Sequence, residues 1–313
     1  MDDAITLWPD LPYASWRDTL QTVHLWTQIV GKVRLALTPW LNHSWHVPFY
    51  VNARGIGTSP IPIGNEILEI DFDFISHHLT ARTSRGEHDG FPLAPISVAE
   101  FYHRVFEVMG RLGVTVAIDD TPSEMVGVPR YSEDRSHASY DAAAAHRFWR
   151  ALVQIDRVFK LFRSGFLGKA SPTHFFWGSF DLAVTRFSGR SAPRHPGGIP
   201  GLSDAVACEA YSHEESSAGF WPGNDAFPQA AFYSYTYPEP AGFRNRAVTP
   251  QAHFDTTLGE FILPYDTVRA AADPNALLLD FLSTTYAAAA DAAGWDRAAL
   301  ECPLGVPGKV REP

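Results

Sequence analysis

Cysteine and lysine are scarce in this sequence. Only Cys208 and Cys302 are present, so the chain has no disulfide framework and no cysteine-rich zinc motif, which fits a reducing compartment. The 25 basic residues comprise 21 arginines and 4 lysines. Chemistry that proceeds through a lysine Schiff base therefore has few residues to use.

Excess positive charge and long apolar runs are also missing. The formal net charge is −10, which argues against nucleic acid as a partner, because such binding needs a cationic surface that displaces counterions. The N-terminal segment MDDAITLWPD lacks the cationic and apolar regions of a signal peptide, and no run approaches the roughly 18 apolar residues of a membrane helix. We therefore expect a cytoplasmic protein with no membrane partner.

The apolar content is nevertheless high, at 45% of 313 residues, so the chain can bury a substantial core. Its periodicity predicts an α+β fold with mostly antiparallel sheets, arranged as two similar halves that each run helix, strands, helix. The segment between them is rich in proline, serine and charge and has no period, as a linker would be. We place the N-terminal half at residues 1–118, the linker at 119–141, the C-terminal half at 142–301 and a flexible tail at 302–313.

In the first half, an apolar stripe predicts a helix from Asp18 or Thr19 to Pro39. Alternation predicts strands over 47–54, 66–74 and 79–84, with a two-residue turn at 76–77, followed by a helix over 98–112 and a short strand over 114–118. That turn would place Asp71 opposite Arg82, in a solvated row of charges.

In the second half, Asp141 is the expected cap of a helix, and a strand-like run follows at 173–190. A long loop rich in proline and glycine is then expected from Ser188 to Gln229. The last predicted elements are strands at 231–237 and 260–266 and a helix from Pro274 to Gly294.

The two leading helices share a pattern. Leu25-Trp26 followed by Val30 and Arg34 matches 148–149 followed by Val153 and Arg157 at a constant offset. This favours an internal duplication with a pseudo-two-fold axis and a crevice between the halves, where ligand sites are common. The alternative is that any two amphipathic helices share a few apolar positions.

Several long strings carry a resemblance to a known family. They are HLWTQIVGKVRLAL, NHSWHVPFYVNARGIGTSPIP, HRFWRALVQIDRVF, GKASPTHFFWGSFDLAVTRFSGR and EAYSHEESSAGFWPG. Together they resemble a bacterial family defined only as a domain of unknown function, over nearly the whole chain. The resemblance implies one unit that spans both halves, and it implies no activity and no site.

Histidines are the first candidates for chemistry, because histidine with a carboxylate binds zinc or non-haem iron and also serves as a general base. His43 and His174 are the candidate ligands of a divalent metal, zinc or iron. His43 and His46 can share a metal only if His43 lies in the turn before the strand. The alternative is that each histidine simply bonds to a backbone carbonyl or carboxylate.

Strand faces supply the second group of candidates. His46, Tyr50, Asn52 and Arg54 share one predicted face, which suits recognition of a small polar or anionic molecule, with His46 and Tyr50 available for proton transfer. In the second half Trp177, Ser179, Asp181 and Thr185 share a face, with His174 on the opposite one. The alternative is a sheet that faces solvent and holds no site.

Two loops add further candidates: His137 as a substrate-binding residue, and His213 with Glu214 as catalytic residues. Tyr233, Tyr235 and Tyr237 form a row that we expect to pack against another layer. Glycine patterns near 55–60 and 165–171 do not match dinucleotide or phosphate fingerprints, and no GxSxG motif is present.

Combined, these signals favour a small-molecule enzyme that uses a histidine-rich acid/base or metal site in a crevice between the halves. Its expected catalytic residues are His46, Tyr50, Asp181, His213 and Glu214, and its expected substrate-binding residues are Asn52, Arg54, Trp177 and His137. The alternative is a ligand-binding or protein-interaction module that uses the aromatic loops HPGGIPGL and GFWPGNDAFP.

Overall fold

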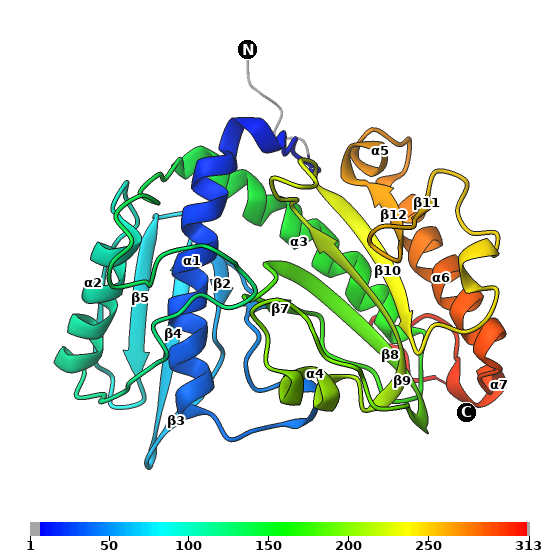
Figure 1. Ribbon diagram of the computed structural model, residues 1–313, viewed down its shortest axis with the longest axis horizontal. Helices are drawn as coiled ribbons and strands as arrows, with labels where there is room; N and C mark the ends of the chain where they lie inside the picture. The colour runs from blue at the N-terminus through cyan, green and yellow to red at the C-terminus, as the bar shows by residue number, and fades with distance from the viewer. Residues whose placement is uncertain (1–6, 312–313) are drawn as a thin grey trace.

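The computed structural model describes residues 7–311 (Figure 1). The N-terminal half contains, in chain order, α1 (Tyr13–Leu37), the 3-10 helix η1 (Asn42–Ser44), β1 (Tyr50–Val51), β2 (Gly55–Gly57), β3 (Ile61–Ile63), β4 (Glu66–Asp73), β5 (His78–Thr83), β6 (His88–Pro92) and α2 (Val98–Arg111). The C-terminal half contains α3 (Ala142–Ser164), β7 (His174–Phe176), β8 (Asp181–Ser191), α4 (Asp204–Ala210), β9 (His213–Trp221), β10 (Ala231–Tyr237), η2 (Phe243–Asn245), β11 (His253–Asp255), β12 (Glu260–Pro264), α5 (Tyr265–Arg269), α6 (Pro274–Ala293) and α7 (Arg297–Leu300).

The strands form two antiparallel sheets, one from each half, so the predicted α+β class is confirmed. The N-terminal sheet has the order β1-β2-β4-β5-β6, with β3 also paired to β4. The C-terminal sheet has the order β11-β12-β10-β9-β8-β7. The sheets meet at Phe49 and Phe175, whose backbones exchange two hydrogen bonds of 2.7 and 2.8 Å.

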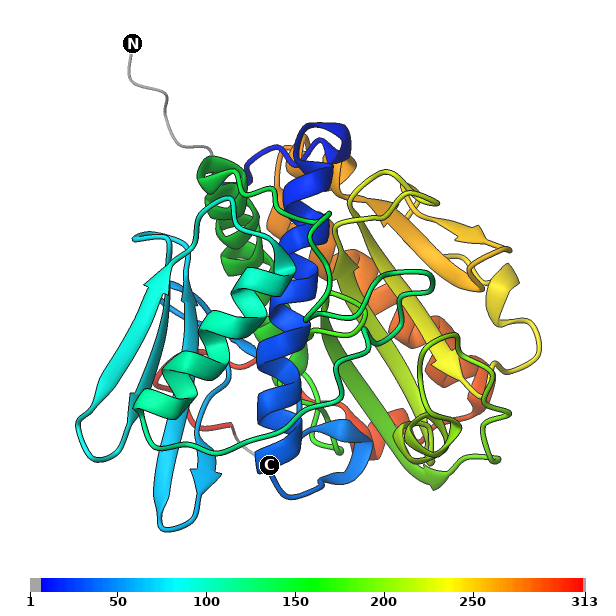
Figure 2. The ribbon, with the colours of Figure 1, turned by 60° about the vertical axis from the view of Figure 1, so that its left-hand side comes forward.

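Helices α1 and α2 cover one face of the N-terminal sheet (Figure 2). Alternation along β4 directs Leu68, Ile70 and Phe72 toward these helices, where Phe72 stacks on Phe101 of α2 and Phe101 stacks on Trp26 of α1. The opposite face carries charged side chains. Amphipathic periodicity in the helices and in the strand therefore specifies the same interface.

Helices α3 and α6 cover one face of the C-terminal sheet and lie behind it in Figure 1, whereas α4 lies in front. Alternate residues of β8, such as Leu182 and Val184, are buried on the helix-covered side, and Phe220 of β9 joins them. The intervening residues of both strands face forward. This forward face has no long helix of its own half against it.

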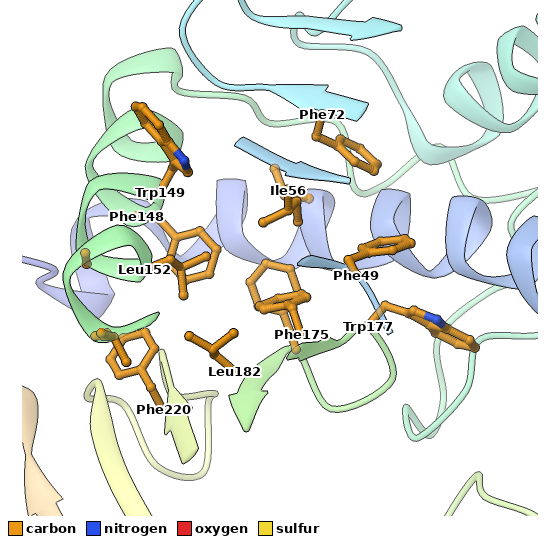
Figure 3. Close-up of a cluster of buried hydrophobic side chains, with 14 of the residues drawn as sticks. Phe49, Ile56, Phe72, Phe148, Trp149, Leu152, Phe175, Trp177, Leu182 and Phe220 are labelled. Carbon is orange, nitrogen blue, oxygen red and sulfur yellow. The ribbon is translucent and has the colours of Figure 1, made fainter. Parts of the chain in front are cut away.

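The two halves share one hydrophobic core. Figure 3 shows its centre, where Phe49 and Phe175 lie in front of α1 and Phe148 of α3 lies beside Phe175. Phe148 and Phe175 each also contact Phe180, with ring centroids 5.3 and 5.0 Å apart. Burial of these aromatic surfaces holds the two sheets together.

Most of the predicted helices are confirmed. The side chain of Asp141 accepts a hydrogen bond of 3.0 Å from the backbone of Ala144 and caps α3, and α2 and α6 begin where expected. Helix α1 was expected to begin at Asp18 or Thr19, and it begins earlier, at Tyr13. Thr19 does not cap it, because its hydroxyl accepts a hydrogen bond from the backbone of Asp141 instead.

The strand predictions were less accurate. The expected strand over 47–54 is only two residues long, and residues 114–118 form no strand. Asp71 lies opposite Thr80 in the strand register, because the turn after β4 has four residues, although its carboxylate still forms an ion pair of 2.7 Å with Arg82. Asp73 stabilises that longer turn by accepting hydrogen bonds from the backbones of Ile75 and Ser76.

The largest error concerns the predicted loop at 188–229, because this segment contains α4 and the nine-residue strand β9. Strand β9 pairs with both β8 and β10 and lies in the middle of its sheet. Its sequence, HEESSAGFW, has charged and small residues where a buried strand normally has branched or aromatic ones. Packing against its neighbours, and not local propensity, determines this strand.

The internal duplication stays a prediction. Each half has a long helix, then a set of antiparallel strands, then a helix against its sheet, and the first strands of the two halves meet at Phe49 and Phe175. These features agree with the expected pseudo-two-fold arrangement. They do not by themselves establish a common origin of the halves.

Candidate functional site

A cleft of about 1350 Å³ covers the forward face of the C-terminal sheet. Its floor comes from β8, β9 and β10, and its walls come from α1, from the segment 119–137 and from the segment around α4. In Figure 1, α4 lies in front of this sheet and α1 stands to its left. The segment expected to be a linker thus also forms one wall of this cleft.

The register of β8, β9 and β10 places their residues side by side in rows across the floor of the cleft. One row contains Ala183, Gly219 and Tyr233, and the next contains Thr185, Ser217 and Tyr235. The Thr185 and Ser217 hydroxyls lie 2.9 Å apart and form a hydrogen bond. A third row contains Phe187, Glu215 and Tyr237. Hydroxyl and carboxyl groups therefore alternate with small side chains across the sheet.

Asp181 and Tyr233 form a hydrogen-bonded pair across this floor. The Tyr233 hydroxyl donates to one carboxylate oxygen of Asp181, and the Ser179 hydroxyl donates to the other at 2.5 Å. Tyr233 reaches Asp181 because its ring lies directly over Gly219, where a Cβ atom would be only 2.3 Å from the ring. Burial raises the pKa of Asp181, although both hydrogen bonds act in the opposite direction.

Two further carboxyls face the same part of the cleft. Burial raises the pKa of Glu124 and of Glu260 to about 7, and the negative charge of Asp181 adds to both shifts. Neither carboxyl has a hydrogen bond or ion pair with any residue in the range 7–311. Asp181 therefore lies between two acids that change protonation near neutral pH.

Glu215 lies in the third row, beside Phe187 and Tyr237. Its side chain is only 5% exposed, and its carboxyl has no hydrogen-bond or ion-pair partner within the described residues. Burial raises the pKa of Glu215 to about 8, and the charge of Lys169 only partly offsets this. A buried acid without a partner is costly and is typical of a site that binds something.

Gln28 of α1 fixes the position of the segment that carries Glu124. Its amide donates to the carbonyl of Ser123 at 2.9 Å and accepts from the Ser123 backbone at 2.8 Å and from the Tyr131 hydroxyl at 2.7 Å. Glu124 itself has a positive φ of 57°, and its carboxyl lies against Gly178, where a Cβ would be 2.1 Å away. These contacts direct the Glu124 carboxyl into the cleft.

A basic cluster lies next to the third row. Lys169 Nζ donates to His43 Nε2 at 2.5 Å, while His43 Nδ1 donates to the carbonyl of Ala210 at 2.7 Å. The Lys169 ammonium also lies over the rings of Trp45 and Phe187, 5.2 and 4.8 Å from their centroids. Both ring nitrogens of His43 are thus engaged, and burial lowers the pKa values of His43 and Lys169.

Several predicted site residues do lie in this cleft. Asp181, Trp177, His174 and His137 all line it, together with His43. His174 was expected on the face opposite Asp181, but both lie on the cleft side, because residues 177–180 form a turn between β7 and β8. Burial lowers the pKa of His174 to about 3, so its imidazole is neutral at neutral pH.

The predicted group His46, Tyr50, Asn52 and Arg54 lies elsewhere and does not share one strand face. His46 is buried in the turn before β1, where its ring contacts Trp40, and Tyr50 lies beside Arg34. Asn52 donates to Asp71 at 2.9 Å and also lines a separate hollow against α3, whereas Arg54 pairs with Asp73 on the outer face of the N-terminal sheet. Asn52 and Arg54 thus bond to aspartates of β4, outside the cleft.

The predicted catalytic residues His213 and Glu214 do not lie on the cleft floor as Glu215 does. Glu214 points to the other face of β9, where it forms an ion pair with Arg190 at 2.6 Å. His213 lies next to His43, with ring centroids 5.7 Å apart, at the margin of the cleft. The sequence analysis therefore identified the correct segment but selected Glu214, whereas the neighbouring residue Glu215 is the acid that lines the cleft.

No metal centre is visible in the part of the chain that the structure describes. Within residues 7–311, no three histidine, cysteine, aspartate or glutamate side chains are close enough together to hold a metal ion. His43 and His174, the expected ligands, both line the cleft, but within the described residues neither belongs to a group of three ligating side chains that could hold an ion. A zinc or iron site stays an untested hypothesis.

None of the helices within residues 7–311 has both the length and the apolar character that a membrane span requires.

Comparison with curated proteins and comparison with solved structures each found no match. One family model matches residues 8–302, nearly the full length, and it describes a family of unknown function, DUF5996. The match spans both halves of the fold, and the chain belongs to the DUF5996 family.

Proposed function

We propose that this protein is an enzyme that acts on a small polar molecule by acid–base catalysis in the cleft over the C-terminal sheet. The observation that supports this most directly is the convergence of Glu124, Asp181 and Glu260 in one cleft. Acids whose pKa values lie near the working pH are the most effective proton donors and acceptors. Clefts that hold such groups are frequent sites of catalysis.

Each acid has a distinct role in this proposal. Asp181 is held in place by Ser179 and Tyr233 and serves as the oriented proton acceptor. Glu124, on the opposite wall, has no partner and is free to donate or accept a proton as the substrate requires. The charge of Asp181 raises the pKa of Glu124, so the two acids favour opposite protonation states, as an acid and a base must.

The shape of the cleft suits a small molecule. Its volume of about 1350 Å³ exceeds the roughly 300–1000 Å³ of ordinary ligand pockets and leaves room for an extended substrate and water. Trp45, Trp177 and Trp221 contribute aromatic surfaces to its walls. The cytoplasmic location expected from composition also belongs to this proposal.

A non-enzymatic ligand-binding protein is the alternative. It is favoured by the segment 195–202, because Gly201 accepts a backbone hydrogen bond of 3.1 Å from Glu124, so two loops meet over the cleft. Such a closure could retain a ligand without changing it. A measurement of turnover, and not of binding, separates the two functions.

The test is to incubate the purified chain with a metabolite extract and follow consumption of individual compounds by mass spectrometry. We expect at least one polar metabolite to disappear with the unchanged chain and to persist with Asp181→Asn or Glu124→Gln. Loss of a general acid or base typically slows a reaction by about 10²–10⁴-fold. Glu214→Gln is the matched control, because Glu214 lies on the opposite face of β9 and should retain full activity.

A compound that binds but is never consumed would support the ligand-binding alternative. Turnover that persists in both cleft variants would contradict the proposed roles of Asp181 and Glu124. Both variants replace a carboxyl by an amide of nearly equal size. Folding can be verified from their thermal unfolding.

A further inference from the structure

The charges that line the cleft are strongly unbalanced. Four acids face it without a salt bridge to any described residue: Glu124, Asp181, Glu215 and Glu260. Among the described lining residues, Arg17 is the only arginine or lysine, and it is held by Asp225 through contacts of 2.5 and 2.7 Å. The lining therefore lacks a positive charge that could compensate its buried acids.

The nearby basic groups do not correct this imbalance. Burial lowers the pKa of His24 to about 4, so this histidine is neutral, and its ring donates to the carbonyl of Gly178. Lys169 bonds to His43 and forms no ion pair with Glu215, and its charge only partly offsets the rise in the Glu215 pKa. Lys32 pairs with Asp119 at the rim. A ligand with a positive charge would supply the counter-charge that the lining lacks.

The acids are spread along the floor and are not gathered at one point. Asp181 precedes Leu182, which pairs with Phe220 of β9, whereas Glu215 pairs with Phe187, six residues after Asp181 on β8. At about 3.3 Å per residue, the positions of the two acids are about 20 Å apart along the strand. Glu260 is the first residue of β12, where the next residue, Phe261, pairs with Ser234, so it lies on the strand beyond β10.

This spacing excludes a single metal ion as the counter-charge, since no three ligating side chains come together in residues 7–311. It suits a long molecule with positive charges at intervals. The hydroxyls of Tyr211 and Tyr235, 3.1 Å apart, lie along the same floor and add aromatic faces, which attract ammonium groups.

We propose that the cleft binds a linear polyamine as its substrate, with one ammonium group near Asp181 and Glu260 and another near Glu215. This proposal rests on the enzyme function proposed above and specifies its substrate class. The Glu215 carboxyl carries the argument, because it is buried to 95%, faces the cleft and has no partner among the described residues. An ammonium group would supply the charge-assisted hydrogen bonds that this carboxyl lacks.

Titration calorimetry with spermine tests the proposal. Measurements belong near pH 7 and at about 150 mM salt, where the Debye length of about 8 Å suppresses binding to the acidic surface. We expect spermine to bind more tightly than the shorter putrescine, which cannot reach both ends of the floor. Glu215→Gln and Glu260→Gln should each weaken spermine binding by about tenfold or more. Glu214→Gln, the matched control on the other face of β9, should change it less than about twofold.

Proton release gives a second readout. Burial keeps Glu215 and Glu260 partly protonated near neutral pH, and a bound cation favours their charged forms. Spermine binding should therefore release protons, which is measured by comparing binding heats in two buffers with different ionisation enthalpies. The affinity of the unchanged chain for spermine should rise between about pH 6 and pH 8, and that of Glu215→Gln should rise less steeply.

Unchanged spermine affinity in both cleft variants, or binding without proton release, would overturn the polyamine proposal. A neutral oligosaccharide such as maltotriose is the comparison ligand. If maltotriose bound and the cleft variants weakened it, the catalytic cleft would stand and the substrate class would be a polyol. Failure of the enzyme proposal is recognised separately, by turnover that survives Asp181→Asn.

Discussion

The hydroxyl of Tyr233 on β10 reaches across the neighbouring strand β9 and donates a hydrogen bond to the Asp181 carboxylate on β8. Removing this donor should impair proton transfer, because Asp181 would lose both its orientation and a bond that stabilises its charged form. We expect Tyr233→Phe to raise the Asp181 pKa further and to reduce turnover by about tenfold or more, at a stability cost of about 1 kcal/mol. The pH dependence of turnover measures this. Tyr237→Phe is the control, since within residues 7–311 the Tyr237 hydroxyl bonds only to the carbonyl of Pro193. Equal losses in both variants would contradict a specific role for Tyr233.

Gly219 allows that contact, because a methyl group at this position would lie 2.3 Å from the Tyr233 ring. Gly219→Ala should displace the ring and reproduce the activity loss of Tyr233→Phe, although the tyrosine is still present. Overpacking of this kind also costs about 1–3 kcal/mol. Turnover and chemical denaturation provide the measurements. Gly110→Ala is the control, because a Cβ at Gly110 would have no neighbour within 4 Å. Full activity of Gly219→Ala would mean that the ring does not need its present position.

Glu215 should make the fold less stable as pH rises. Below its ordinary pKa of 4.5 the carboxyl is protonated in both the folded and the unfolded chain, whereas up to a pKa of about 8 only the folded chain retains the proton. Its contribution to stability is therefore present at low pH and is lost between about pH 4.5 and pH 8. Glu215→Gln keeps a neutral side chain at every pH. It should match the unchanged chain near pH 5 and exceed its free energy of unfolding by on the order of 3 kcal/mol above pH 8.

Urea denaturation across this pH range measures the difference. Glu214→Gln breaks a partly exposed ion pair with Arg190 and should shift stability by less than about 1 kcal/mol, with no such trend between pH 5 and 8. A parallel pH profile for Glu215→Gln and the unchanged chain would show that Glu215 is not protonated in the folded state.

Gln28 should control the order of the wall that carries Glu124. Gln28→Met preserves the size of the side chain but leaves the Ser123 backbone and the Tyr131 hydroxyl without their partner. We expect a loss of on the order of 3 kcal/mol and faster hydrogen exchange across residues 119–131. Gln21→Met is the matched control, because Gln21 makes only an exposed contact with Asp225. Unchanged exchange in Gln28→Met would mean that other contacts hold this wall.

Metal removal tests the remaining hypothesis for the histidines. In the structure, Lys169 and the Ala210 carbonyl occupy the two nitrogens of His43, so a metal would have to displace Lys169. We expect treatment with a chelator to leave the unfolding temperature unchanged, because a tightly bound metal would otherwise stabilise the fold by mass action. Stoichiometric zinc or iron that His43→Ala or His174→Ala abolishes would contradict this expectation.

Sequence periodicity predicted those parts of the fold where one surface is uniformly apolar. The stripe of α3 and the capping role of Asp141 are local properties, so both were predictable. Strand β9 was not, because Ser217 and Gly219 are small to accommodate Tyr233 and Tyr235 from the next strand. That requirement exists only once the sheet has formed.

The same reason explains the partial success at the site. Asp181 and Trp177 were recognised from their types and alternation, and both line the cleft. Glu215 was missed because the sequence analysis did not predict strand β9. Neighbouring residues of a strand point to opposite faces of the sheet, so the face that Glu215 occupies could not be assigned. Glu124 lies in a segment without any period, and its position depends on Gln28 and Gly178, which are distant in sequence.

The backbone pairing of Phe49 with Phe175 has a consequence for the behaviour of the molecule at high concentration. Strands β1 and β7 are each the last strand of their sheets, and unpaired terminal strands invite recruitment of foreign chains and fibril growth. Because β1 and β7 lie against each other, each covers the edge of the other strand. Mutations that loosen the aromatic contacts around them should therefore promote aggregation before they abolish secondary structure.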